Sequence, residues 1–328
     1  MSVRVSVRVS VRMRVRIRVR VIVFILFLRY RSANGRTSFH EAACKGNVEL
    51  GSFLIKKGAR VNITDDDGET PLHYAAYKGH HDYVAFLLLR GARVNETNKY
   101  MQTPLHKAAI DGHEQVGHVL LNHGACVDAK DDAGHNVLHY TALHGLAAMS
   151  SMFIMMEARV DEKDQIGRTS LHLASCTGHT DVATVLINNG SHVHEGAHGG
   201  QTALHLAAAN GHVAMIYLLL NNAARVNATC HDGETPLHVA ALNGYKEVCF
   251  VLISNGARVE ARDHKQHTPL HFAGCKGHED VGSLLLMKGA DVNCTNFKGT
   301  TPLIAAAYYG VESMVELLWF TQNNIRRI

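Results

Sequence analysis

Apolar and polar positions follow one pattern along most of this chain, and the pattern repeats every 33 residues. Each unit holds a short apolar block such as Tyr74-Ala75-Ala76-Tyr77 and a second block such as Phe86-Leu87-Leu88-Leu89. The pattern predicts a first helix that stops at Gly79 and a second helix from about Asp82 to Arg90. A polar turn then leads into the next unit. A strict period of this length indicates a stacked array of small units rather than one globule.

Marker residues show where each first helix begins. All five prolines directly follow a threonine, as in Thr70-Pro71-Leu72-His73. Threonine is a good helix N-cap, and proline is favoured at the first helical position. The histidine lies three residues after the threonine, where a capping-box partner lies, which predicts a side-chain bond back to the threonine. The ninth unit has Ile304 at this position, and the histidines of the other eight are His40, His73, His106, His139, His172, His205, His238 and His271.

The unit resembles the ankyrin repeat. The resemblance rests on Gly68-Glu69-Thr70-Pro71-Leu72-His73-Tyr74-Ala75-Ala76, Gly79-His80, Leu87-Leu88 and Gly91-Ala92-Arg93-Val94-Asn95, and residues 233–243 and 268–278 match as well. The expected fold is therefore all-α, a solenoid of nine 33-residue helix-turn-helix repeats with short extended fingers. We expect three segments: 1–34, the array over 35–320, and a C-terminal tail over 321–328. The resemblance implies a curved solenoid whose first helices and finger tips line a concave binding face.

The charge is divided unevenly between the N-terminal segment and the array. Residues 1–34 carry nine arginines and no acidic residue, whereas the rest of the chain holds the other 24 basic residues and all 29 acidic ones. The formal net charge of +4 is thus the sum of a basic segment and an array of net charge −5. A mildly acidic array does not favour a nucleic-acid partner.

The N-terminal segment has a low-complexity pattern of its own. Residues 3–20 alternate apolar residues with arginine or serine, which is the period of a strand, but the run is longer than the usual ~3–10 residues of a strand. A disordered tail is the first interpretation, and a cationic membrane-surface segment is the alternative. The apolar run 21–28 is shorter than the ~20 residues of a spanning helix. We therefore expect membrane contact only through residues 1–34.

Cysteine usage indicates a reducing compartment. The chain has seven cysteines and no C-x-x-C pair, which is typical of free thiols. A cytoplasmic location is expected, with a nuclear one as the alternative. Four Asn-x-Thr sequons, at Asn62, Asn95, Asn227 and Asn293, share one position of the unit, so the fold of the unit explains them without glycosylation.

The 24 histidines raise the question of a metal site. Besides the eight capping histidines, five follow the glycine that ends the first helix, and both sets are interpreted as structural. The one weak metal candidate is the group His192, His194 and His198 on one finger. Three finger-tip histidines of successive units, His198, His231 and His264, would be too far apart to bind one zinc ion. Fingers spaced like their helices lie ~8–10 Å apart, whereas zinc–nitrogen bonds are ~2.0–2.1 Å. No cofactor is expected.

The sequence favours a binding protein over an enzyme. It has no phosphate-cradling glycine loop, G-x-S-x-G elbow or H-E-x-x-H motif. The expected function is a non-enzymatic scaffold that binds an unidentified partner protein on the concave face. A membrane-tethered adaptor and a fragment of a larger multi-repeat protein are the alternatives. The candidate partner-binding residues are Asp66, Glu69, Tyr77, Tyr100, Ile110, Leu143, Ile166, Leu242, Phe297, Tyr308, Tyr309 and Trp319.

Two regions of the array are expected to behave differently from the others. The fourth unit has Asn136-Val137 in place of Thr-Pro and Glu157 in place of a glycine, and its second helix relies on Met149, Met152, Met155 and Met156. Methionine packs adaptably and specifies a core poorly, which predicts a soft unit. At the other end, Trp319-Phe320 is expected to be exposed and to form an apolar patch with Phe297, Tyr308 and Tyr309 that binds a partner or drives self-association. The alternative is that residues 321–328 fold back and cover Trp319-Phe320.

Overall fold

The computed structural model describes residues 31–325, which form two compact units divided between Asp132 and Ala133. Residues 1–30 and 326–328 lie outside the described residues. The predictions for the alternating Val/Arg segment, for the apolar run 21–28 and for the last three residues therefore stay predictions.

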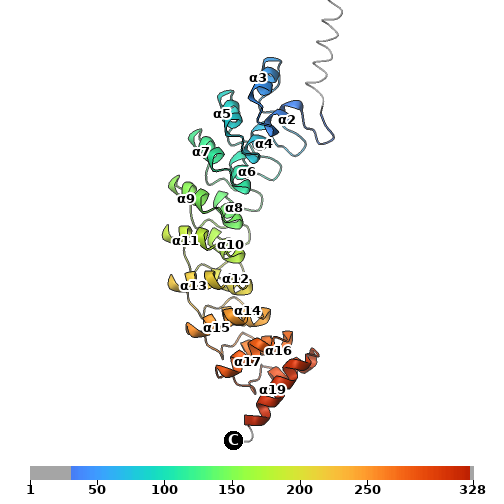
Figure 1. Cartoon of the computed structure of the whole chain (residues 1–328), viewed down its shortest axis with the longest axis vertical. Helices are drawn as coiled ribbons and strands as arrows, with labels where there is room; N and C mark the ends of the chain where they lie inside the picture. Colours follow the sequence, from blue (N-terminus) through green and yellow to red (C-terminus); the bar gives the residue numbers. More distant parts are fainter. Residues whose placement is uncertain (1–30, 326–328) are drawn as a thin grey trace, which may run out of the picture. The chain divides into compact units, whose positions relative to one another are not determined.

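The first unit contains three helix-turn-helix repeats (Figure 1). Each repeat pairs a first helix of seven or eight residues with a second helix of nine. The helices are α2 (Ser38–Cys44), α3 (Val48–Lys56), α4 (Pro71–Tyr77), α5 (His81–Leu89), α6 (Pro104–Asp111) and α7 (Glu114–Asn122).

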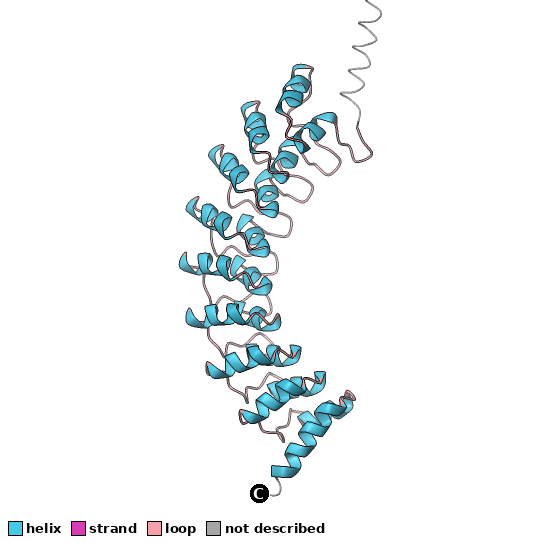
Figure 2. Cartoon of the chain, viewed as in Figure 1, coloured by secondary structure: helices cyan, strands magenta, loops and turns pink. Residues whose placement is uncertain are grey.

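The second unit contains six repeats of the same kind. Its helices are α8 (Val137–His144), α9 (Ala147–Met155), α10 (Ser170–Thr177), α11 (Thr180–Asn188), α12 (Ala203–Ala209), α13 (Val213–Asn221), α14 (Pro236–Asn243), α15 (Lys246–Ser254), α16 (Pro269–Lys276), α17 (Glu279–Met287), α18 (Pro302–Tyr308) and α19 (Glu312–Ile325). The described residues thus confirm an all-α fold of nine repeats. Figure 2 shows the helices joined by loops, and in the described part the single β-bridge joins Gly196 and Thr202.

Within each unit the repeats stack in two layers. First helices pack on the first helices of neighbouring repeats, as α4 does on α2 and α6, and second helices do the same. The fingers project from the first-helix side of each unit (Figure 1). Small residues at the first-helix contacts, such as Ala75 and Ala76, are fully buried. Helices this short are marginal in isolation, so packing between neighbours supplies most of their stability.

The predicted capping box forms at the start of the first helices. At Thr70 the hydroxyl Oγ1 accepts the backbone N–H of His73 at 3.4 Å and lies 2.8 Å from His73 Nδ1. The backbone N–H of Thr70 donates to the same Nδ1 at 3.1 Å. Since Nδ1 is an acceptor, the proton of the neutral ring lies on Nε2, which donates to the carbonyl of Gln102 in the next finger at 3.0 Å. Each capping histidine therefore joins its own helix start to the next repeat.

The sequon asparagines also join neighbouring repeats. The side-chain N–H of Asn62 donates to the Gly91 carbonyl at 3.1 Å, and its Oδ1 accepts the Arg93 backbone N–H at 2.9 Å. Asn95 and Asn227 make the same pair of bonds to the repeats that follow them. We call this pair of bonds the asparagine staple. Because both ends of the amide are in use, the fold accounts for these asparagines without a glycan.

The fourth repeat departs from the expected packing in one respect. Met149 and Met152 are buried in it, but Met155 and Met156 are exposed. The prediction that all four methionines support this helix was therefore wrong for the last two. Helix α9 ends at Met155. The chain then changes direction at Glu157, whose φ of 66° lies in the left-handed region.

The last helix is longer than the other second helices. No glycine follows its apolar block, and α19 continues to Ile325 over 14 residues. Gln322, on this extension, donates its side-chain N–H to Asn293 Oδ1 at 2.7 Å. Residues 321–325 thus extend the helix, and Trp319 and Phe320 are both exposed. The alternative in which this segment folds back to cover them is not what the described residues show.

Candidate partner-binding surface

The surface expected to bind partners consists of the finger tips and the C-terminal ends of the first helices, which we call the recognition face. In the first unit, Tyr77 ends α4 and Tyr100 lies at a finger tip, and both rings are exposed. A lysine ammonium lies beside each ring, Lys78 Nζ at 4.8 Å from the Tyr77 centroid and Lys99 Nζ at 4.9 Å from that of Tyr100. These contacts favour a cation–π arrangement that presents both rings to solvent.

Carboxylates accompany the rings of the first unit. Lys99 pairs with Asp67 on the neighbouring finger, and this hydrogen bond raises the pKa of the Lys99 ammonium. Asp66 is exposed, as a contact residue should be. Ile110, at the end of α6, is half-buried. This part of the face therefore combines two rings, two lysines and the exposed carboxylate of Asp66.

Glu69 does not fit the role expected for it. Only 8% of the residue is exposed, and Oε1 accepts Asn98 Nδ2 at 2.8 Å and pairs with Lys107 Nζ at 2.6 Å. A buried carboxylate with two partners stabilises the contact between neighbouring fingers. We therefore correct the sequence-based assignment of Glu69 as an exposed contact residue.

The recognition face of the second unit carries its own aromatic group, at the last finger and at the C-terminal end of α18. Phe297, Tyr308 and Tyr309 are 61%, 83% and 62% exposed. The two tyrosine rings pack edge to face with their centroids 5.2 Å apart, and Lys298 Nζ lies 5.9 Å from the Phe297 centroid. Rings held against each other lose little freedom on binding, which suits them to contact a partner.

The aliphatic candidates of the second unit are placed less uniformly. Ile166, at a finger tip, is exposed, whereas Leu143 and Leu242 are half-buried. Leu242 lines a small pocket of about 240 Å³ together with Phe272, Cys275 and Tyr309. Sequence reasoning missed this pocket, because it arises from side chains of three successive repeats and from no motif within one.

Trp319 lies apart from the recognition face. It belongs to α19, a helix of the second layer, whereas Tyr308 and Tyr309 lie at the end of α18 in the first layer. Among the described residues, no ring contact joins it to Phe297, Tyr308 or Tyr309. The sequence-based grouping of these four residues into one patch therefore has no direct ring contact in support.

The eight capping histidines are buried, and six of them have a lowered pKa that favours the uncharged ring near neutral pH. Burial lowers the pKa of His40, His73, His172, His205 and His271, and it lowers that of His238 to about 4. The histidines after the first-helix glycine have a different partner. His80 Nε2 lies 2.9 Å from the Cys44 carbonyl of the preceding repeat. The structural interpretation of both sets fits these contacts.

The weak metal candidate is not assembled as a ligand set. In residues 31–325, no group of three or more histidine, cysteine or acidic side chains is arranged to hold a metal ion. His192 instead pairs through Nδ1 with Asp161, and His194 and His198 are both exposed. The three rings share a finger but do not converge.

The seven cysteines are free thiols, and four of them are poor nucleophiles. Burial raises the pKa of the Cys44, Cys275 and Cys294 thiols, and it raises that of Cys249 to about 12. A reactive cysteine requires the opposite shift, because the thiolate is the nucleophile. These four side chains act as packing residues.

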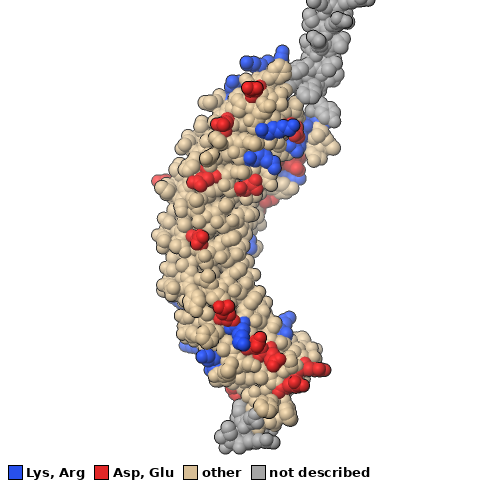
Figure 3. Space-filling view, viewed as in Figure 1, with Lys and Arg blue, Asp and Glu red and all other residues tan. Residues whose placement is uncertain are grey.

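Charged side chains are unevenly spread on the face shown in Figure 3. In the second unit they are sparse over α10–α13 and more frequent around α15–α19. Within residues 31–325, no helix is long and apolar enough to cross a membrane.

Comparison with known proteins identifies the family. A family model described as "Ankyrin repeats (3 copies)" matches residues 21–98, 88–164, 128–196, 191–263 and 260–327. These matches cover far more than half of the chain, so the protein belongs to the ankyrin-repeat family. No curated protein matches the chain. The family is generally non-catalytic and provides protein-binding surfaces, and the match begins at residue 21, before the start expected from the repeat signals.

Proposed function

We propose that this protein is a non-enzymatic scaffold that binds partner proteins through its recognition face. The observation that carries the proposal is the placement of exposed aromatic rings on that face in each unit. Tyr77 and Tyr100 form one group, and Phe297, Tyr308 and Tyr309 form the other. Aromatic residues dominate binding energy at protein interfaces, and exposed rings gathered on one face indicate a contact site.

A cytoplasmic location is part of the proposal. Seven free thiols support a reducing compartment, because an oxidising one favours disulfide formation. Tethering to a membrane would depend on residues 1–34, most of which lie outside the described residues. Fractionation of cells that express the chain with and without residues 1–34 distinguishes a tether from a tail.

The proposal is tested by quantitative capture with the full chain and paired variants. Tyr77→Ala with Tyr100→Ala removes the first aromatic group, and Tyr308→Ala with Tyr309→Ala removes exposed rings of the second. Matched controls are Tyr217→Ala on α13 and Phe250→Ala on α15, which remove exposed rings from second helices. Trp319→Ala forms a separate arm for α19.

We expect one set of captured proteins to be lost at least about tenfold in a recognition-face variant and kept in the controls, which corresponds to about 1.4 kcal/mol of binding. Circular dichroism verifies that each variant is folded. Capture that is unchanged in both recognition-face variants but falls in the second-helix controls contradicts the proposed surface.

A further inference from the structure

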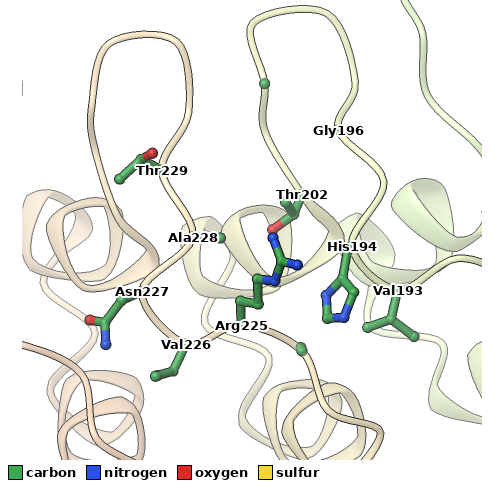
Figure 4. A pocket seen from close by; sticks show the side chains of 11 residues that line it. Val193, His194, Gly196, Thr202, Arg225, Val226, Asn227, Ala228 and Thr229 are labelled. Atoms are coloured by element: carbon green, nitrogen blue, oxygen red, sulfur yellow. The ribbon is translucent and has the colours of Figure 1, made fainter.

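A pocket of about 620 Å³ lies between two neighbouring fingers of the second unit (Figure 4). His194 and Thr202 lie on one finger, and Arg225 and Thr229 approach from the next. The Arg225 side chain extends across the gap toward Thr202, with the His194 ring beside it (Figure 4). The recognition face and its aromatic groups do not include any of these residues.

The pocket is open because the asparagine staple is missing at this junction. His194 occupies the position that Asn62, Asn95 and Asn227 hold in other repeats. At the next junction, Asn227 Oδ1 accepts the backbone N–H of Arg258 at 2.9 Å. Arg225 is the counterpart of Arg258, yet within residues 31–325 its backbone N–H meets no acceptor. The change from asparagine to histidine thus leaves both a gap and an unused donor.

The Arg225 guanidinium is also without an acidic partner in the described part of the chain. At the same position of other repeats, Arg93 pairs with Glu96 at 3.2 Å and Arg159 pairs with Glu162 at 3.0 Å. The residue three positions after Arg225 is Ala228, so the internal ion pair cannot form. A free guanidinium offers five N–H donors in a planar fork that matches an oxyanion.

The other residues that line the pocket also suit a negatively charged group. It supplies an imidazole at His194 and hydroxyls at Thr202 and Thr229, and no carboxylate lines the pocket. A volume of this size is typical of sites for small molecules and exceeds that of a bare ion. We propose that this pocket binds a small molecule through an oxyanion group, a phosphate or a carboxylate, held by the Arg225 guanidinium and its backbone N–H.

The test is a titration of the full chain carrying ¹⁵N-labelled arginine, observed by nuclear magnetic resonance at constant ionic strength. The probes are glycerol 1-phosphate, succinate, inorganic phosphate and glycerol. We expect a saturable shift of the Arg225 amide and Nε signals with a charged organic probe and none with glycerol. The tighter of glycerol 1-phosphate and succinate identifies the oxyanion, and inorganic phosphate shows whether the organic part contributes.

Two variants and one internal control make the test specific. His194→Asn rebuilds the staple, so we expect the chain to gain stability and the affinity to fall at least tenfold. Arg225→Ala is expected to abolish the shift. Arg258 has the same neighbours in sequence but a closed staple, and its signals should not respond. Equal responses of Arg225 and Arg258, no saturable shift with any probe, or unchanged affinity in His194→Asn overturns the proposal.

Discussion

Single residues decide how well each repeat begins. In most repeats a threonine hydroxyl serves as both donor and acceptor, since it accepts the histidine N–H and donates to Nδ1. In the fourth repeat Asn136 takes this position, and its Oδ1 lies 3.2 Å from His139 N and 2.6 Å from Nδ1. An amide oxygen only accepts, and Nδ1 already accepts the Asn136 backbone N–H at 3.2 Å. Two acceptors therefore face each other, and Asn136 Nδ2 is buried without a partner in the described residues.

Asn136→Thr is therefore expected to stabilise the protein. Restoring a hydroxyl that donates and accepts should raise the free energy of unfolding by about 1 kcal/mol. Urea unfolding followed by circular dichroism measures the change. Thr235→Asn, the reverse exchange in a regular repeat, is the matched control and should lower stability. A destabilised Asn136→Thr protein would show that the two facing acceptors do not lower the free energy of unfolding.

Glu157 and Ala223 carry backbone strain at the end of their second helices. Both have φ of 66°, at a position where neighbouring repeats have Gly124, Gly190 and Gly256. Left-handed backbone costs a non-glycine residue on the order of 1 kcal/mol. Glu157→Gly and Ala223→Gly should each stabilise by roughly this amount in urea unfolding, and Gly190→Ala should destabilise. If the exchanges to glycine and Gly190→Ala changed the free energy of unfolding by the same amount and in the same direction, the backbone at Glu157 and Ala223 would not be strained.

At the scale of elements, the buried histidines make the first helices sensitive to acid. Folding lowers the pKa of His238 to about 4, whereas the unfolded chain keeps it near ~6.5. The unfolded state thus binds more protons between these values, so this contribution is fully present above about pH 6.5 and is lost as the pH falls toward 4. Five more capping histidines are shifted in the same direction.

His238→Gln is expected to reduce this acid sensitivity. Glutamine can complete a capping box without titrating. Between about pH 7 and pH 5, the wild type should lose on the order of 2 kcal/mol more stability than the variant. Urea unfolding at the two pH values gives the difference, and His231→Gln at an exposed finger tip is the control. Equal losses in wild type and His238→Gln would refute the assignment of the acid sensitivity to this ring.

The fourth repeat is expected to open before its neighbours. Besides Asn136 and Glu157, it buries a hydroxyl pair, Ser150 Oγ donating to Thr141 Oγ1 at 2.8 Å, where other repeats place apolar atoms. Two of its four methionines also face solvent. Local stability varies along repeat arrays, so hydrogen exchange should be faster over residues 134–165 than over 170–221. Uniform protection across the two segments would contradict a soft repeat.

For the whole molecule, the sequence predicted the fold more completely than it predicted the binding site. Period, prolines and glycines specify the helices to within a residue or so: the second helix expected over Asp82–Arg90 is α5, His81–Leu89. These signals are reliable because caps and turns are formed by residues that are close together in the sequence. The site depends on contacts between repeats, which explains why Glu69 was misplaced and why the pocket near Leu242 was missed. The open staple at His194 also becomes visible only when the bonds of successive junctions are compared.

The central claim, that partners bind the recognition face, is tested most directly by hydrogen exchange of the full chain with and without a captured partner. The account predicts protection in at least one of two regions, residues 66–78 with 99–111 or residues 297–309. The second helices α5, α13 and α15 should exchange at the same rate in both states. Protection confined to those second helices, with unchanged exchange at the finger tips and first-helix ends, would contradict the account.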